Sequence, residues 1–238
     1  MSKDIKTPFG KISPEVSLIP IYYLLFIYGF VYILPFWKNL IGISWFDWLR
    51  SEDGPLEWLQ FFEYLISSLL AFLIFLRRKK KKEINSLIWL LIAFLSLIIA
   101  GEEISWGERL TGIGITLISD LNVQGETNFH NLPFFHNYLL DPVFEVSCIF
   151  LGWFGWRKFK NVAAFPNKEM SLYFLFVALF YFYFDISWAS TTEQIRNDQE
   201  IFEFLLSSGI FIHCLKNFRK ITWTKTSFMY IKVIKTSK

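Results

Sequence analysis

Residues 101–137 read GEEISWGERLTGIGITLISDLNVQGETNFHNLPFFHN, a polar stretch that separates two long apolar runs of the sequence. It contains two of the three histidines of the chain, five acidic residues and the single arginine Arg109. The flanking runs approach the roughly 20 residues that a helix needs to cross a bilayer. The pattern predicts that helices hold this stretch at a membrane surface.

The composition is typical of a membrane protein. Of the 238 residues, 53% are hydrophobic and 20% are aromatic, which is more apolar than an ordinary soluble domain. The apolar runs predict six spans, with ends near residues 17–36, 57–76, 84–101, 139–157, 170–190 and 200–216. The predicted fold is therefore all-α, a polytopic helical membrane bundle.

This pattern also predicts the domain organisation. Residues 1–216 are expected to form a single transmembrane helical domain, and residues 217–238 a basic cytoplasmic tail. Residues 101–137 form a 37-residue outer loop between the third and fourth helices. The first apolar run lacks a small-residue cleavage site, so we expect a retained span rather than a signal peptide. Cys148 and Cys214 fall inside predicted spans, which gives no support to a disulfide framework.

The basic residues lie on one side of the predicted bundle. If the N-terminus is cytoplasmic, the four inner segments (1–16, 77–83, 157–169 and 216–238) hold 20 of the 24 lysines and arginines. Because cytoplasmic loops carry an excess of basic residues, this distribution predicts an N-in, C-in topology in the inner (cytoplasmic) membrane. The run Arg77–Lys82 is expected to contact anionic lipid at the cytoplasmic face. A nucleic-acid partner is not expected, and the sequence identifies no protein partner.

The acidic residues have the opposite bias, and helical spacing places several of them in stripes inside the spans. An ionised side chain in hydrocarbon costs at least a few kcal/mol, so such residues are expected to face the interior of the bundle. We therefore predict an outward-facing polar cavity. Its predicted lining residues are Glu57, Glu63, Arg109, Asn128, Asn131, Asp141, Glu145, Asp185 and Glu203.

Four side chains of the 101–137 stretch are candidate catalytic residues: Glu102, Glu103, Glu126 and His130. Glu102 and Glu103 follow an apolar span directly, so at least one of them is expected to point into the bundle. Glu126 and His130 are four residues apart and would share one face of a helical turn. Carboxylates and imidazoles in this arrangement suit general acid–base catalysis.

The same residue types also bind Zn²⁺ and other divalent metals. The candidate ligand set is Glu103, Glu126, His130 and His136. The sequence has no H-E-x-x-H and no similar paired metal motif. A divalent metal cofactor and a metal-free site therefore both remain open.

Three motifs resemble those of a group of uncharacterised bacterial multi-pass membrane proteins. They are EDGPLEW at 52–58, GEEISWGERL at 101–110 and NVQGETNFHN at 122–131. The resemblance covers about a third of the chain. It implies membrane class, and it implies no activity.

These observations leave three functions open. The first is a membrane enzyme, a hydrolase or transferase that acts on a lipid-linked or membrane substrate with or without a metal. The second is a cation- or proton-coupled transporter that uses the same acidic residues. The third is a non-catalytic membrane scaffold or assembly factor.

Overall fold

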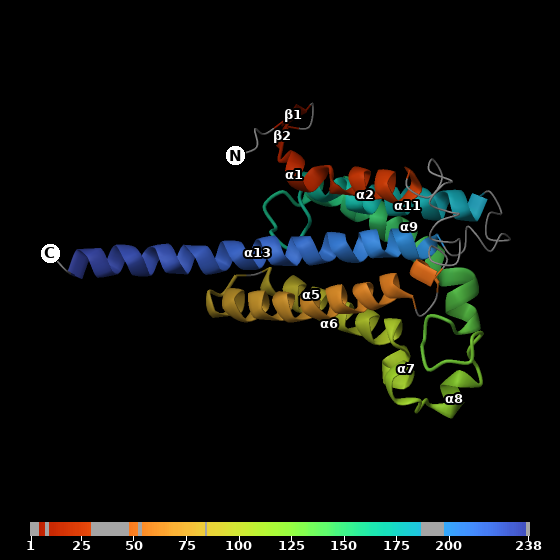
Figure 1. Ribbon diagram of the computed structural model, residues 1–238. Helices are drawn as coiled ribbons and strands as arrows, with labels where there is room; N and C mark the ends of the chain where they lie inside the picture. The colour runs from red at the N-terminus through yellow and green to blue at the C-terminus, as the bar shows by residue number, and fades with distance from the viewer. Residues whose placement is uncertain are drawn as a thin grey trace.

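The computed structural model is predominantly helical (Figure 1). It describes residues 5–7, 10–29, 48–51, 54–83, 85–186 and 198–236. A short antiparallel hairpin, β1 (Ile5–Thr7) with β2 (Gly10–Ile12), pairs Lys6 with Lys11. The helices that follow it are α1 (Pro14–Ser17), α2 (Ile19–Tyr28), α5 (Pro55–Lys80), α6 (Ser86–Glu103), α7 (Glu108–Thr111), α8 (Thr116–Ser119), α9 (Leu140–Ile149), α10 (Trp156–Lys158), α11 (Ser171–Ile186) and α13 (Gln199–Thr236).

Helices α5 and α6 form an antiparallel hairpin. Gly54 precedes α5 in an extended conformation and Pro55 occupies its first position, where the missing N–H costs nothing. Ser68 of α5 donates a hydrogen bond to the carbonyl of Ala93 in α6 at 2.8 Å. Ala71 and Ala93 are both buried, and their small side chains let the two helices approach closely.

Helix α13 lies between two layers (Figure 1). It packs on α5 on one side and on α11 on the other, and α11 in turn packs on α9. The helix that contains α9 widens into two π-helical segments, Phe135–Leu139 before it and Phe150–Gly155 after it. Gly209 of α13 lies so close to α11 that an added Cβ would come within 2.9 Å of the Cβ of Tyr173.

Two buried clusters form the core. The larger joins α2, α9, α11 and α13 and includes Tyr173, Phe174 and Leu205. The smaller joins α5, α6 and α13 and includes Trp89 and Cys214. Because α13 contributes to both clusters, it is the element that connects the two layers.

Within the residues that the structure describes, three helices are long and apolar enough to cross a membrane: α5, α6 and the Gln199–Thr222 part of α13. They correspond to the predicted second, third and sixth spans. Many large apolar side chains on α5 and α6 face outward, among them Leu69, Leu87 and Phe94. The structure therefore confirms a helical fold whose outer surface is apolar along these helices.

The remaining predicted spans match shorter or interrupted elements. The apolar helical segment Pro14–Tyr28 covers the first part of the predicted first span, and the rest of that span, residues 30–36, lies outside the described residues. The predicted fourth span consists of α9, its following π-helical segment and α10. Helix α11 is described through Ile186. The predicted tail at 217–238 begins as a continuation of α13, which extends without a break to Thr236.

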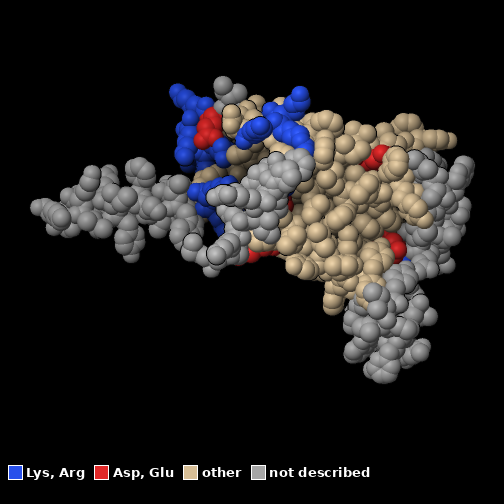
Figure 2. All heavy atoms as spheres, turned by 90° about the horizontal axis from the view of Figure 1, so that it is seen from above, with Lys and Arg blue, Asp and Glu red and all other residues tan. Residues whose placement is uncertain are grey.

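Lysine and arginine side chains gather at one end of the molecule (Figure 2). This is the end where α5 finishes with Arg77–Lys80 and where Arg78 pairs with Glu83. At the opposite end, Arg50 forms a buried ion pair with Asp198 at 2.5 Å, which ties the approach to α5 to the approach to α13. The bundle therefore has one basic end, and at its other end the acidic residue Asp198 forms a buried ion pair with an arginine.

Candidate functional site

Three successive residues after α6 adopt a left-handed backbone, with φ of 47° at Ser105, 54° at Trp106 and 90° at Gly107. Only glycine adopts this conformation without strain. Side-chain contacts hold the other two residues: Ser105 donates to Glu126 at 2.5 Å, and the Trp106 indole N–H donates to Glu102. This turn starts the polar cap, residues 104–131, at the end of the bundle away from the basic end (Figure 1).

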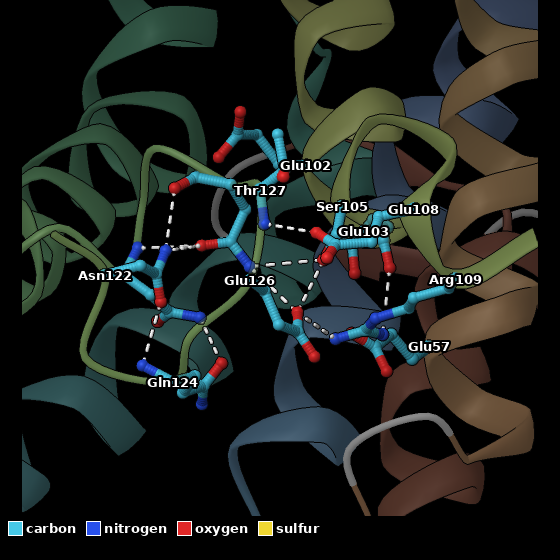
Figure 3. A network of polar contacts seen from close by, with 12 residues as sticks. Glu57, Glu102, Glu103, Ser105, Glu108, Arg109, Asn122, Gln124, Glu126 and Thr127 are labelled. Carbon is cyan, nitrogen blue, oxygen red and sulfur yellow. Dashed lines mark hydrogen bonds and ion pairs between the residues drawn. The ribbon is translucent and has the colours of Figure 1, made fainter. Parts of the chain in front are cut away.

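Arg109 lies at the centre of the polar cap (Figure 3). Its guanidinium forms an ion pair with Glu57 of α5 at 2.6 Å and another with Glu126 at 3.1 Å. It also donates to the backbone carbonyl of Glu103 at 3.1 Å. One side chain therefore connects α5, the end of α6 and the far part of the cap.

The carboxylate of Glu102 binds the segment that contains His130. Its Oε2 accepts the backbone N–H of Phe129 at 2.7 Å and that of His130 at 2.9 Å. The same oxygen lies 3.1 Å from Nδ1 of the His130 ring. Since a carboxylate orients an imidazole by accepting a hydrogen bond from one ring N–H, Glu102 favours the tautomer protonated on Nδ1.

Glu108 has a comparable role on the other side of the cap. It accepts the backbone N–H of Thr127 at 2.6 Å, and the hydroxyl of Thr127 accepts the N–H of Ile115 at 2.7 Å. Gly114 lies against the Glu108 carboxylate, where any Cβ would overlap it. Glu108 therefore closes the loop between α7 and α8.

Side-chain amides fix the remainder of the cap (Figure 3). Asn128 is fully buried, donates to Glu126 at 3.1 Å and accepts from Asn122 at 2.7 Å. Asn131 donates from its backbone N–H to Asn128 at 3.3 Å and from its side chain to Gln124. The two asparagines predicted as cavity-lining residues thus form the inner frame of the cap.

A second set of carboxylates, the acidic layer, lies below the cap between α5, α6 and α13. Its members are Glu57, Glu63, Glu103, Glu200 and Glu203. Glu103 lies close enough to Glu57, Glu200 and Glu203 for their charges to interact. These acidic residues come from three separate helices, as the prediction of an inward-facing polar layer requires.

Neutral polar groups stabilise parts of the acidic layer. Gln60 donates to Glu200 at 2.8 Å, and the Tyr181 hydroxyl of α11 donates to Glu203. Glu63 accepts hydrogen bonds from the hydroxyls of two neighbouring serines of α13, Ser207 at 2.6 Å and Ser208 at 2.9 Å. The layer is therefore held largely by hydroxyl and amide donors, with Arg109 as the cation beside Glu57.

His130 connects the cap to this layer. Its ring lies close enough to Glu203 for the two charges to interact, while Nδ1 is engaged by Glu102. Nε2 makes no hydrogen bond to any residue that the structure describes, and about a third of the side chain (36%) is exposed. The imidazole is thus oriented by one carboxylate and faces another.

The other predicted site residues have different positions. Asp141, at the start of α9, lies close enough to Tyr181 to interact electrostatically. Glu145 is half-buried on α9 and makes no hydrogen bond or ion pair with the described residues. The side chains of Asp185 and His136 lie outside the described residues, so their predicted roles in the cavity and in metal binding stay predictions.

Of the candidate metal ligands, the three that the structure describes, Glu103, Glu126 and His130, are not brought together as one group. Within the described part of the chain, no three His, Cys, Asp or Glu side chains are arranged to hold a metal ion. Glu126 is engaged by Arg109, Ser105 and Asn128, and His130 by Glu102. The arrangement of these side chains suits proton transfer and cap formation.

Some polar residues near the site were not among the predicted site residues. Gln60, Tyr181 and Glu200 belong to the polar stripes that helical spacing predicts, three or four positions from predicted lining residues. Glu108 had no such signal, because its partner Thr127 is 19 positions away.

Comparisons of the chain with protein-family models, with curated proteins and with solved structures gave no match. The resemblance inferred from the three motifs therefore stays a prediction.

Proposed function

We propose that the chain is a multi-pass membrane protein of the inner (cytoplasmic) membrane, with the basic end in the cytoplasm and the polar cap outside. Three helices of spanning length and the one-sided distribution of lysine and arginine support this orientation. The basic run Arg77–Lys82 then lies at the inner surface, where it attracts anionic lipid.

We further propose that the outer site is an acid–base catalyst, a hydrolase or transferase that acts on a lipid-linked or membrane-embedded substrate. The observation that supports this best is the Glu102–His130 pair, in which Nδ1 lies 3.1 Å from the carboxylate and Nε2 has no partner among the described residues. A base oriented by a third group is the arrangement used in nucleophilic and general-base catalysis.

Each residue has a distinct role in this proposal. His130 is the general base, and Glu102 is the positioning residue that fixes its tautomer. Glu203 lies close enough to the ring for the two charges to interact, and its carboxyl group can act as the acid. Arg109 is engaged with Glu57 and Glu126 and holds the cap in place.

A comparison of membrane lipids tests the catalytic proposal. Membranes from cells that carry the wild type, His130→Ala, Glu102→Gln or the control Glu83→Gln would be extracted and compared by untargeted mass spectrometry. We expect one lipid or lipid-linked species to accumulate in the first two variants and not in the control, because loss of a general base slows a reaction by about 100-fold or more. Identical profiles in all four strains, with normal protein levels, would leave the scaffold interpretation.

The acidic layer supports a second candidate, transport coupled to protons or cations. Glu63 lies six positions after Glu57 on α5, and among the described residues it is bound only to serine hydroxyls, an environment in which a proton can be gained and lost. Proteoliposomes with a pH-sensitive dye inside would distinguish a transporter from an enzyme. A transporter predicts a proton flux that Glu63→Gln abolishes and that His130→Ala leaves largely intact.

A further inference from the structure

The basic end of the molecule contains a pocket that the outer site does not involve. It has a volume of about 480 Å³ and lies between the segment that follows α10 and the α13 helix. Four lysines line it, and no acidic residue does. The lysines are Lys160, Lys168, Lys216 and Lys220. Their excess positive charge makes the pocket attractive to an anion.

Much of the remaining lining is apolar and aromatic, beside three asparagines and His213. Trp156, Phe159, Phe165, Pro166 and Met170 contribute to the lining. A pocket with cationic side chains beside aromatic ones suits a ligand that has an anionic group attached to an apolar part.

The loop that forms one wall is fixed before any ligand binds. The rings of Phe159 and Phe165 stack with 4.4 Å between centroids, and backbone hydrogen bonds join Val162 to Phe159 and Phe165 to Val162. His213 of α13 lies 3.1 Å through Nε2 from the carbonyl of Ala164. Since a carbonyl only accepts, Nε2 carries the proton and donates it to this loop.

His213 is itself held from two sides. Its ring stacks on Trp89 of α6 with 5.4 Å between centroids, and Nδ1 lies 3.4 Å from the side-chain amide of Asn217. His213 is therefore a structural link between α6, α13 and the loop. It keeps the pocket open rather than contacting a reacting group.

One lysine of the pocket has a neighbouring acid. Lys216 forms an ion pair with Glu169 at 2.6 Å. Burial alone would raise the pKa of Glu169, but the hydrogen bond and charge of Lys216 outweigh it and hold the pKa below its ordinary value. Glu169 therefore stays ionised and orients the Lys216 ammonium at the pocket wall.

We propose that this pocket binds a phosphate-bearing anion: the lysines contact the phosphate, and the aromatic wall contacts the apolar part of the same molecule. In the orientation given above, the pocket opens at the inner membrane surface, where phospholipid head groups supply this chemistry. A soluble phosphate ester supplies the same anion without the apolar part. The pocket does not depend on the catalytic proposal for the outer site.

Native mass spectrometry of the full chain in detergent tests this proposal. The chain would be titrated separately with dioleoylphosphatidylglycerol, with neutral dioleoylphosphatidylcholine and with glycerol phosphate. We expect one molecule of the anionic lipid to bind in preference to the neutral lipid. Lys160→Gln/Lys220→Gln is expected to weaken that binding by about tenfold or more. Saturable binding of glycerol phosphate that equals lipid binding would assign the site to a soluble ester.

The matched control is Lys158→Gln/Arg219→Gln, which removes the same charge from two exposed side chains that lie outside both the pocket lining and the Arg77–Lys82 run. It should bind the anionic lipid like the wild type. An equal loss in both double variants would overturn the proposal, because it would mean that diffuse charge and not the pocket attracts the anion. The proposal would also be overturned if the wild type bound neither dioleoylphosphatidylglycerol nor glycerol phosphate in preference to dioleoylphosphatidylcholine. Thermal unfolding of each variant checks that the fold is intact.

Discussion

Nη1 of Arg109 and Oε1 of Glu57 lie 2.6 Å apart, and both side chains are almost completely buried. The pair joins the polar cap to the first turn of α5, so the outer loop is not an independent appendage of α6. Glu126 completes the contact at 3.1 Å from the same guanidinium. The position of His130, which lies in the same cap, therefore depends on the ion pairs that Arg109 forms with Glu57 and Glu126.

Replacement of Arg109 is expected to destabilise the whole outer end. Arg109→Gln leaves the buried carboxylate of Glu57 without its cation, and removal of one member of a buried pair costs about 3–5 kcal/mol. Thermal unfolding in detergent, followed by tryptophan fluorescence, should show a clear decrease in Tm. The exposed Arg219 gives the control, since Arg219→Gln removes the same charge and should change Tm little.

Hydrogen exchange can distinguish the contributions that Glu102 and Glu108 make to the stability of the polar cap. Glu102→Ala removes the acceptor of the Phe129 and His130 amides, and Glu108→Ala removes that of the Thr127 amide. A hydrogen bond to a charged group contributes about 1.5–3 kcal/mol, so the affected amides should exchange about tenfold faster or more. Each variant serves as the control for the other. Equal acceleration at all three amides would mean that the cap opens as one unit.

The close approach of α13 and α11 predicts that Gly209 does not tolerate a larger side chain. Alanine would gain roughly 1 kcal/mol of helix propensity. Its Cβ would however lie 2.9 Å from the Cβ of Tyr173, an atom next to the backbone that cannot swing away. Overpacking of this kind costs about 1–3 kcal/mol, so Gly209→Ala should lower Tm.

Gly155 provides the comparison for that experiment. An added Cβ there meets no atom closer than 3.3 Å, so Gly155→Ala should change the stability less. An increase in Tm for Gly209→Ala would show that the two helices can separate without loss of packing.

The ion pair between Glu169 and Lys216 predicts a dependence of stability on pH. Because the pKa of Glu169 is lowered in the folded protein, the pair stabilises the fold above the ordinary pKa of a glutamate. This contribution should disappear as the pH falls from about 5 toward 3. It should stay below about 1 kcal/mol, since both side chains are partly exposed. Tm against pH should be flatter in this range for Lys216→Gln than for the wild type.

Cysteine labelling tests the orientation in the membrane. Cys148 and Cys214 are buried, so introduced cysteines can be read against a low background. Leu117 in the cap is 74% exposed, and Leu117→Cys should react with a membrane-impermeant maleimide on intact cells. Lys81→Cys at the basic end should react only after the cells are permeabilised. The reverse pattern would contradict the proposed topology.

Sequence predicts the local features of this molecule better than the features that depend on contacts between distant residues. The apolar lengths of α5, α6 and α13 are local properties, so the second, third and sixth spans could be predicted from residue type alone. The interruption of the fourth span by π-helical segments could not, because it depends on packing against α11.

The site shows the same division. Helical spacing places Glu57 and Glu203 on polar stripes of their helices, and in the structure Glu103 lies close enough to both for their charges to interact. The role of Glu102 could not be predicted in this way, because its partner Phe129 is 27 positions away. The intervening turn places a serine and a tryptophan in a conformation typical of glycine, which no local sequence signal marks.

That left-handed turn at Ser105–Gly107 also implies an order of events during synthesis. The acceptor that holds Ser105, Glu126, is translated 21 residues later, which takes about a second or more at the usual rate of elongation. During that interval the turn lacks the contact that compensates its strain. In the proposed orientation, helix α6 can therefore enter the membrane at once, but its cap end becomes fixed only after the segment up to His130 has been translocated. Export of this short segment would then be the step that commits the nascent chain to its final arrangement.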